Sequence, residues 1–275
     1  MIGALIGSLQ KTLAANAASY GVAIKLKRQC DSTIGKRFTS GIDHDGNGER
    51  WLVEQVAPHT RLFIDVGANV GEWSVMFAAV APAAHGLLFE PAPDTLARLR
   101  RNLAGAGLDR LEVFGCALAD EAGEADFFAE PNQGETSSLL SGHANAAAQK
   151  IRVQVATLDD VLDARGVTDV DMLKIDAEGF DMRVMLGARR LIGERRCKVI
   201  QFEYNHPWMA AGATLTAAYA LLEGAGYQVR LLKADGLHRL DPRVTGEYFR
   251  YSNFVAYLPG PVAERLEARP HLTIS

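Results

Sequence analysis

The sequence has few cysteines and no excess of positive charge. Its 275 residues include three cysteines and 29 Lys and Arg against 33 Asp and Glu. No two cysteines form a Cys-x-x-Cys pair, which argues against a disulfide framework and for a reducing compartment, so we expect a cytoplasmic protein. A formal net charge of −4 lacks the basic footprint of nucleic-acid-binding proteins, and we expect no nucleic-acid partner.

Long apolar runs are also missing, so we expect no transmembrane segment. Residues 1–9 are apolar, but the first lysine, Lys11, comes after them, whereas a secretory signal carries basic residues before its apolar run. We interpret residues 1–18 as an amphipathic helix that packs on the domain or on a partner subunit of a homo-oligomer, with membrane-surface contact as the alternative. Residues 1–48 are too poor in apolar residues for their own core. We therefore expect an N-terminal helical cap over 1–48 and one domain over 49–275.

The glycine-rich turn of this chain lacks the G-x-G-x-x-G spacing of dinucleotide sites. The apolar stretch Leu62–Val66 reads as a buried strand and leads into D-x-G-x-x-x-G, formed by Asp65, Gly67 and Gly71. A helical pattern follows, and such a turn lets a ligand approach the backbone and the free N–H groups of a helix start. The acid would repel a pyrophosphate but suits a cationic group such as an amine or a sulfonium.

A second apolar run, Leu87–Phe89, also ends at an acid, Glu90. A carboxylate at the tip of the second strand is placed to accept hydrogen bonds from both ribose hydroxyls. A nucleoside with a positively charged tail fits Asp65 and Glu90 together. S-adenosylmethionine is such a molecule, and we predict it as the cofactor.

From Leu62 onward, predicted strands alternate with predicted helices, which is typical of an α/β domain with a parallel sheet covered on both faces. The expected strands are Leu62–Val66, His85–Phe89, Leu111–Cys116, Ala125–Ala129, Ile151–Val155, Val170–Ile175, Val199–Phe202, Tyr227–Leu232 and Ser252–Leu258. The expected helices are Glu49–Val56, Glu72–Val80, Pro93–Ala104, Thr157–Leu162, Phe180–Ile192 and Thr214–Ala225. Residues 130–150 are polar and interrupt the alternation, as inserted binding segments do.

Three motifs carry a family resemblance. They are Phe63-Ile-Asp-Val-Gly-Ala-Asn-Val-Gly71, Phe89-Glu-Pro91 and Leu173-Lys-Ile-Asp-Ala-Glu-Gly179. In this order they resemble the FkbM family of S-adenosylmethionine-dependent methyltransferases, and the resemblance covers residues 49–258. It implies a Rossmann-like class I methyltransferase fold, with a mostly parallel seven-stranded sheet flanked by helices and the last strand antiparallel between its neighbours. It also implies O-methylation of a sugar, glycan or secondary-metabolite hydroxyl, so the partner would be a small-molecule or glycan acceptor.

The resemblance also implies cofactor contacts, residue by residue. The methionine end would be cradled by Asp65, Gly67, Asn69 and Gly71. Glu90 would hold the ribose, and Cys116 and Ala117 would border the adenine. Ser137 and Ser138 match the polar loop that resembles the acceptor lid.

Acids that follow other strands are the catalytic candidates, because ligands of open α/β sheets bind at the carboxyl ends of the strands. An acceptor hydroxyl needs a base or a metal ion to take its proton. Our candidates for this chemistry are Asp176, Glu178 and His206, whose imidazole titrates near neutral pH. In the alternative, Asp176, Glu203 and Asn205 bind Mg²⁺ through oxygen atoms. A strand-end acid can also serve only as a helix cap.

Two other functions and one other site fit parts of the sequence. A non-catalytic nucleoside-binding module would not need the acids after the later strands, and an NAD-dependent oxidoreductase would need a different glycine spacing. The stretch Asp43–Glu54 fits the calcium-loop pattern D-x-[DN]-x-[DN]-G-x5-E. Arg50 stands where an apolar residue is usual and no helix is expected to enter the loop, so we expect no ion there.

Overall fold

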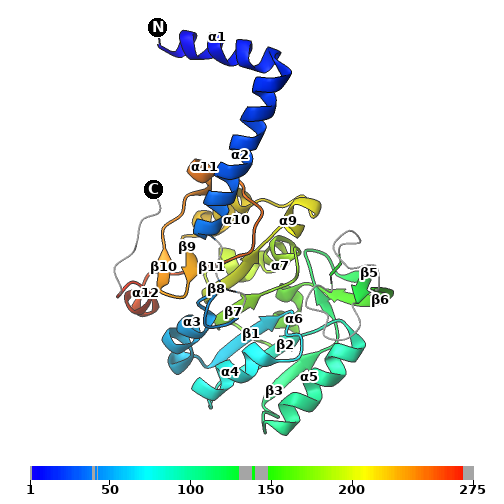
Figure 1. Cartoon of the computed structure of the whole chain (residues 1–275). Coiled ribbons are helices and arrows are strands. Elements are labelled where there is room, and N and C mark those ends of the chain that lie inside the picture. The colour runs from blue at the N-terminus through cyan, green and yellow to red at the C-terminus, as the bar shows by residue number, and fades with distance from the viewer. Residues whose placement is uncertain (1, 39–40, 42, 130–137, 140–147, 269–275) are drawn as a thin grey trace. The chain divides into compact units, whose positions relative to one another are not determined.

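The computed structural model describes residues 2–38, 41, 43–129, 138–139 and 148–268. The chain divides into two compact units, Met1–Thr39 and Ser40–Ser275, and each is described by itself (Figure 1). This division follows Thr39, so residues 40–48, which we predicted within the cap, belong to the second unit. Among the described residues, no helix is long and apolar enough to cross a membrane.

The first unit consists of two helices, α1 (Ile2–Ala15) and α2 (Ala17–Phe38). Asn16 separates them because its side-chain oxygen accepts hydrogen bonds from the backbone N–H groups of Ala18 and Ser19, at 2.9 and 3.3 Å, as an N-cap does. The predicted N-terminal helix is thus present. Its docking on the domain or on a partner stays a prediction.

The second unit is built on a sheet of eight strands in the order β10-β9-β11-β8-β7-β1-β2-β3. Its strands are β1 (Leu62–Val66), β2 (His85–Phe89), β3 (Leu111–Phe114), β7 (Val170–Ile175), β8 (Cys197–Tyr204), β9 (Gln228–Lys233), β10 (Gly236–His238) and β11 (Ser252–Tyr257). Five neighbouring strands, from β3 through β2, β1 and β7 to β8, are parallel. β11 is antiparallel to both β8 and β9. The predicted class I sheet is therefore confirmed, and the short edge strand β10 is an addition to it.

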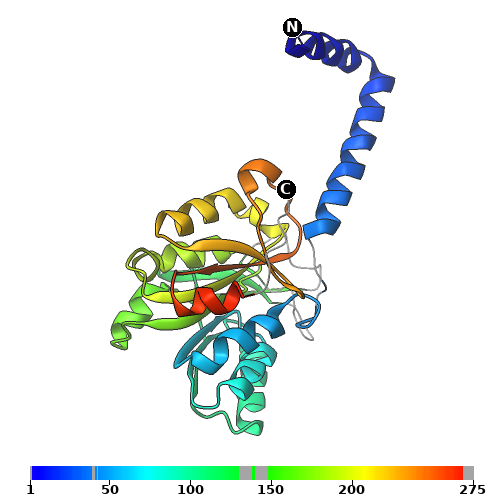
Figure 2. The ribbon, with the colours of Figure 1, turned by 90° about the vertical axis from the view of Figure 1, so that its left-hand side faces the viewer.

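Helices cover both faces of the sheet, as Figures 1 and 2 show. One face carries α3 (Glu49–Val56), the short 3₁₀ helix η1 (Ala57–His59), α4 (Glu72–Val80), α5 (Pro93–Gly105) and α12 (Pro261–Leu266). These share an apolar core with the sheet that includes Leu52, Phe77 and Leu99, all fully buried. The remaining helices are α6 (Leu158–Ala164), α7 (Asp181–Gly187), α8 (Arg189–Gly193), α9 (Pro207–Ala210), α10 (Leu215–Gly224) and α11 (Pro242–Thr245).

A second, three-stranded sheet was not predicted as a separate layer. Its order is β4-β6-β5, with β4 (Ala117–Leu118), β5 (Gly123–Ala129) and β6 (Gln149–Ala156). It has a small apolar cluster of its own around Phe127 and Val153. The chain leaves the main sheet after Phe114, so the strand predicted to continue to Cys116 was too long.

Three other predictions differ from the structure. No helix was expected to enter the loop at Asp43, but α2 runs to Phe38. The helix expected over Phe180–Ile192 is two helices, α7 and α8, that meet at Ala188. A Cβ on Gly187 would lie 2.0 Å from the carbonyl oxygen of Ala119, so glycine is required where α7 ends against the neighbouring chain. β8 runs on to Tyr204, which places Glu203 inside the strand instead of just after it.

Candidate active site

The turn between β1 and α4 forms one wall of the site. Gly67 and Gly71 have φ angles of 76° and 92°, which glycine adopts without strain. A Cβ on Gly67 would lie 1.9 Å from the carbonyl oxygen of Asp176, so the turn passes in direct contact with the end of β7. The N–H groups of Gly67 and Ala68 both donate to the carbonyl of Phe89, at 3.0 Å. The ends of β1, β2 and β7 are thereby held together.

Glu90 lies at the end of β2 and is buried. Its two oxygens accept hydrogen bonds from the N–H groups of Asn69 and Ala92, at 3.0 and 2.9 Å. Burial raises the pKa of Glu90 to about 7, against the effect of these two donors. Each oxygen keeps a second lone pair, so the carboxyl group can still accept from a pair of ligand hydroxyls.

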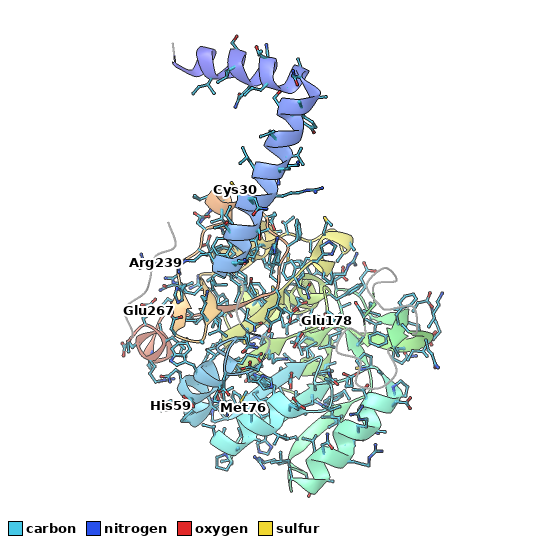
Figure 3. All side chains as sticks on the ribbon, viewed as in Figure 1. Cys30, His59, Met76, Glu178, Arg239 and Glu267 are labelled. Atoms are coloured by element: carbon cyan, nitrogen blue, oxygen red, sulfur yellow. The ribbon has the colours of Figure 1, made fainter. Side chains whose placement is uncertain are left out.

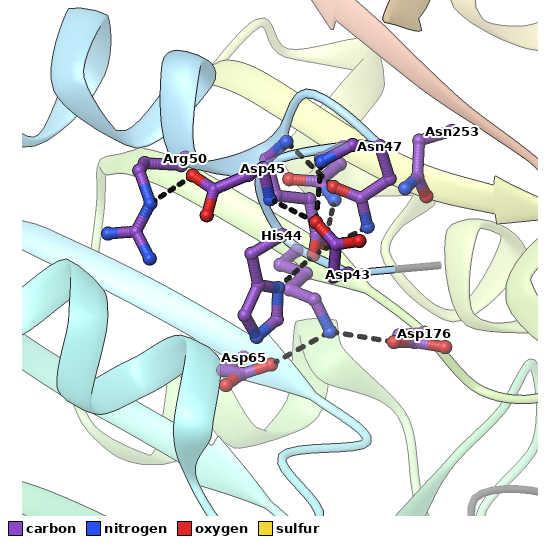
Figure 4. Close-up of polar contacts among 12 residues, drawn as sticks. Asp43, His44, Asp45, Asn47, Arg50, Asp65, Asp176 and Asn253 are labelled. Carbon is purple, nitrogen blue, oxygen red and sulfur yellow. Dashed lines mark hydrogen bonds and ion pairs between the residues drawn. The ribbon is translucent and has the colours of Figure 1, made fainter. Parts of the chain in front are cut away.

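A row of polar side chains crosses the sheet beneath the start of α3. Asp65 on β1 is in register with Lys174 on β7, and Lys174 is in register with Gln201 on β8. The Lys174 Nζ lies 2.9 Å from the Asp176 Oδ2 and 3.6 Å from the Asp65 Oδ1 (Figure 4). Burial would lower the pKa of Lys174, but the charges of Asp176 and Asp65 hold it well above its ordinary value. The ammonium group is therefore a permanent internal cation.

This arrangement changes the role that we expected for Asp65. Its side chain is fully buried, and its Oδ2 accepts a 2.6 Å hydrogen bond from the hydroxyl of Ser74. Burial raises the pKa of Asp65 although Lys174 opposes the shift. The positive charge that this acid attracts is the chain's own lysine. A direct contact between Asp65 and a ligand has no exposed surface to support it.

Sequence reasoning missed the role of the loop before α3, residues 43–48, which covers this row. Glu49, the first residue of α3, is buried and accepts hydrogen bonds from His44 Nδ1 (2.5 Å), Asn47 Nδ2 (3.0 Å) and Gln201 Nε2 (2.5 Å). Burial alone would raise the pKa of Glu49, but the hydrogen bond with His44 and the charge of Lys174 outweigh it and lower the pKa to about 2. Glu49 thus joins the loop, the helix and the sheet.

The other side of the site is acidic. Asp181 is fully buried at the start of α7 and accepts from the N–H groups of Gly179 and Glu203, both at distances between 3.2 and 3.3 Å. Burial raises the pKa of Glu203 well above its ordinary value, and the charges of Asp176, Glu178 and Asp181 add to the shift. Asn205 Nδ2 donates to the Glu203 Oε1 at 2.5 Å. A cationic group placed here would relieve the repulsion among these acids.

The remaining predicted residues take different positions. Glu178 lies on the turn between β7 and α7 (Figure 3), and its carbonyl accepts a 2.8 Å hydrogen bond from the Ser138 hydroxyl. Ser137 lies outside the described residues. Cys116 is half-buried beside buried Ala117 at the start of β4, and burial raises the pKa of its thiol. His206 is exposed after the end of β8, so the structure does not bring it into the polar row.

The loop that fits the calcium pattern uses its oxygens internally. The Asp43 carboxylate accepts from the N–H groups of Asp45 and Gly46, at 3.1 and 2.7 Å, and Asp45 pairs with Arg50. Asn47 faces Glu49 and the hydroxyl of Tyr251, at 3.1 Å. Across the described part of the chain, no three His, Cys, Asp or Glu side chains group as metal ligands do.

Two buried polar atoms bear on whether an adenosyl ligand fits this edge. The side-chain oxygens Asn69 Oδ1 and Asn205 Oδ1 are buried, and neither has a hydrogen-bond partner among the described residues. Buried polar atoms normally have partners. Asn69 also has a positive φ of 47° in the turn beside Glu90. The turn and Glu90 therefore offer the acceptors that a ribose and an amino-acid tail require.

Comparison with known proteins identifies the family. The sequence-family model of the methyltransferase FkbM domain matches residues 65–229, which is more than half of the chain. The chain belongs to the FkbM methyltransferase family. This domain runs from Asp65 at the glycine turn to Val229 in β9, so it includes Glu90, Lys174 and the acidic cluster.

Curated relatives and a solved structure share this similarity. Methyltransferase sdnD of Sordaria araneosa is 27% identical over 206 residues, which cover 65% of this chain and 78% of the relative. The 31-O-demethyl-FK506 methyltransferase FkbM of Streptomyces tacrolimicus is 29% identical and covers 60% of this chain and 72% of its own. The 2-O-methyltransferase NoeI of Sinorhizobium fredii is 27% identical, and the alignment covers 57% of this chain and 68% of the relative. A crystal structure of an FkbM methyltransferase from Methylobacillus flagellatus is 18% identical with a TM-score of 0.49, and covers 72% of this chain and 44% of that one.

The chain is thus a class I methyltransferase, and S-adenosylmethionine is its methyl donor. Among the residues that the FkbM motifs contain, Lys174 carries a signal that sequence reasoning did not use. It is a charged residue between the apolar Leu173 and Ile175 of β7, and such residues are buried only when they are paired. His44 and Glu49 carry no comparable signal, because only the folded chain brings them to the sheet.

Proposed function

We propose that this FkbM methyltransferase transfers a methyl group to a hydroxyl oxygen of a small-molecule or glycan acceptor. The observation that carries the proposal is the carboxylate of Asp176, which is one-third exposed at the end of β7 and held by Lys174 at 2.9 Å. Two relatives are named as O-methyltransferases, the 2-O-methyltransferase NoeI and the 31-O-demethyl-FK506 methyltransferase, and their names support oxygen as the accepting atom.

Asp176 is suited to hold the acceptor hydroxyl. S-adenosylmethionine, when bound, supplies a methyl group activated by a sulfonium charge. The exposed carboxylate of Asp176 would accept a hydrogen bond from the hydroxyl, orient its oxygen in line with that methyl group, and take the hydroxyl proton as the methyl group passes from sulfur to oxygen. Lys174 keeps this carboxylate fixed, and the acidic side of the site, to which Glu178 contributes, would favour a cationic group nearby.

Two points of the sequence analysis remain proposals. Glu178 and His206 are alternative partners of the acceptor, although His206 would need an acceptor that extends past the end of β8. Mg²⁺ at Asp176, Glu203 and Asn205 remains the alternative to a metal-free transfer, because oxygen ligands suit that ion. The buried Asn205 Oδ1, which has no hydrogen-bond partner among the described residues, is the atom that favours this alternative.

Calorimetric titration tests the cofactor site without knowledge of the acceptor. We expect S-adenosylhomocysteine to bind and NAD not to bind. Glu90→Ala should weaken S-adenosylhomocysteine binding by about 1.5–3 kcal/mol, because hydrogen bonds to a charged group are lost. Glu112→Ala, at an exposed acid of β3, is the matched control. Tight NAD binding without S-adenosylhomocysteine binding would favour an oxidoreductase, and ligand binding without methyl transfer to any of a panel of glycans and small alcohols would favour a binding module.

A further inference from the structure

The amino-acid end of the methyl donor carries a carboxylate, and the predicted contacts include no cation for it. The turn residues Gly67, Asn69 and Gly71 are neutral. Lys174 lies in the polar row, but its ammonium already lies between Asp65 and Asp176 and its side chain is only 5% exposed. A positive group at this end of the site would pair with that carboxylate, together with the N–H groups at the start of α4.

His44 has the chemistry and the position for this role. Its Nδ1 is bonded to the Glu49 Oε2 at 2.5 Å, which leaves Nε2 as the free end of the ring, and the side chain is 32% exposed. Figure 4 shows the ring directed toward the end of β1 that carries Asp65. A cavity of about 450 Å³ beside His44 is also lined by Val70, Gly71 and Glu72, the residues that lead into α4. His44 therefore borders the same cavity as the end of the glycine turn.

Glu49 fixes both the orientation and the charge of His44. Two other donors, Asn47 and Gln201, hold the Glu49 carboxylate in place, so it can direct the imidazole as the carboxylate partner of a functional histidine does. The hydrogen bond with Glu49 raises the pKa of His44 above its ordinary value, in spite of burial. The N–H groups at the start of α4 favour an anion at the same place.

We propose that His44, held by Glu49, donates a hydrogen bond from Nε2 to the carboxylate of the methyl donor's amino-acid end. The inference rests on the proposed function, since it presumes that the adenosyl ligand binds at the glycine turn. It assigns a cofactor-binding role to a loop that precedes the domain expected from the sequence. The loop would thus add binding affinity only for a ligand whose amino-acid tail is intact.

The test compares two ligands that differ only in this carboxylate. S-adenosylhomocysteine has it, and S-adenosyl-3-thiopropylamine lacks it but keeps the amine. Calorimetry with wild type and His44→Gln should show a loss of about 10- to 100-fold in affinity for the first ligand, the range for hydrogen bonds to a charged group. Affinity for the second ligand should not change. His59→Gln, at an exposed histidine of η1, should behave as wild type with both ligands.

A pH series of the wild-type protein tests the same contact without a substitution. Glu49 on α3, Lys174 on β7 and Glu72 on α4 act on the charge of His44. Arg50 and Glu54 on α3 line the same cavity. Binding of S-adenosylhomocysteine should be strongest below the raised pKa of His44 and weaken as the pH rises through it, because the neutral ring loses its charge. The amine without the carboxylate should show no weakening in this range.

Each outcome decides a separate question. If wild type binds neither adenosyl ligand, the proposed function itself fails. If wild type binds S-adenosylhomocysteine but His44→Gln binds it equally well, only the role of His44 is overturned. Equal weakening for both ligands would make His44 a structural residue of the loop, and that result also overturns the proposal. A flat pH series for both ligands would do the same.

Discussion

Lys174 is a buried charged side chain of β7, and its environment explains how it can stay there. Asp65 and Asp176 neutralise it, and Glu49 adds a third negative charge nearby. Removal of one partner from a buried ion pair typically costs about 3–5 kcal/mol, because a charge is left without a partner. The lysine therefore also fixes Asp176, the acid that we place at the acceptor.

Asp176→Asn keeps the shape of the side chain and removes its charge. We expect single-turnover methyl transfer to slow by about 10²–10⁴-fold, the usual effect of losing a general base or its equivalent. S-adenosylhomocysteine affinity, measured by calorimetry, should change much less. Asp169→Asn, at an exposed acid before β7, is the control and should keep the wild-type rate.

The same experiment addresses the metal alternative. Transfer by Asp176→Asn at the wild-type rate would remove Asp176 from the mechanism. If a chelator lowers wild-type activity and magnesium restores it, Asp176, Glu203 and Asn205 are ligands of the ion instead of a site for the acceptor alone.

The turn from β1 to α4 depends on one close backbone contact. Gly67 needs a positive φ and also touches the carbonyl of Asp176, whereas Gly107, after α5, has a φ of 67° with no atom within 4 Å of its would-be Cβ. Comparison of the two separates steric contact from backbone strain.

Gly67→Ala should therefore be the more damaging substitution. A positive φ costs an alanine about 1–2 kcal/mol, and overpacking adds about 1–3 kcal/mol. We expect Gly107→Ala to show only the first loss in urea unfolding, and Gly67→Ala to show both and to lose S-adenosylhomocysteine binding as β1 and β7 move apart. Equal unfolding free energies for the two variants would contradict the importance of the contact.

The two units of the chain predict which N-terminal truncation the enzyme tolerates. Between residues 3 and 30, none of the side chains whose burial the structure describes is buried, whereas His44, Asn47 and Glu49 form the wall of the site. Deletion of residues 1–30 should leave the urea midpoint and the S-adenosylhomocysteine affinity unchanged. Deletion of residues 1–48, at the boundary predicted from the sequence, should weaken both, because it removes two hydrogen-bond donors of a buried acid. Equal behaviour of the two truncated proteins would show that the loop is dispensable.

Local sequence patterns determined most of the secondary structure and one side of the site. The strands Leu62–Val66, His85–Phe89 and Val170–Ile175 and the helices Glu49–Val56 and Glu72–Val80 have the predicted bounds. Their apolar periods, turn glycines and flanking acids are short-range signals, and parallel topology then places the strand ends at one edge. These signals place Gly67 and Glu90 at that edge, and their contacts with the cofactor stay a prediction.

Only the tertiary structure decided which charged side chains pair with one another. Asp65 was expected to face a cationic ligand, but the register of β1 and β7 places Lys174 beside it. His44 was part of a calcium-like pattern in the sequence. In the structure it lies beside the glycine turn because it is hydrogen-bonded to Glu49, which accepts a hydrogen bond from Gln201, 152 residues away in the chain. Composition and spacing report which charges a chain contains. Which charges meet depends on strand register and long-range packing, and these arise only when distant segments come together.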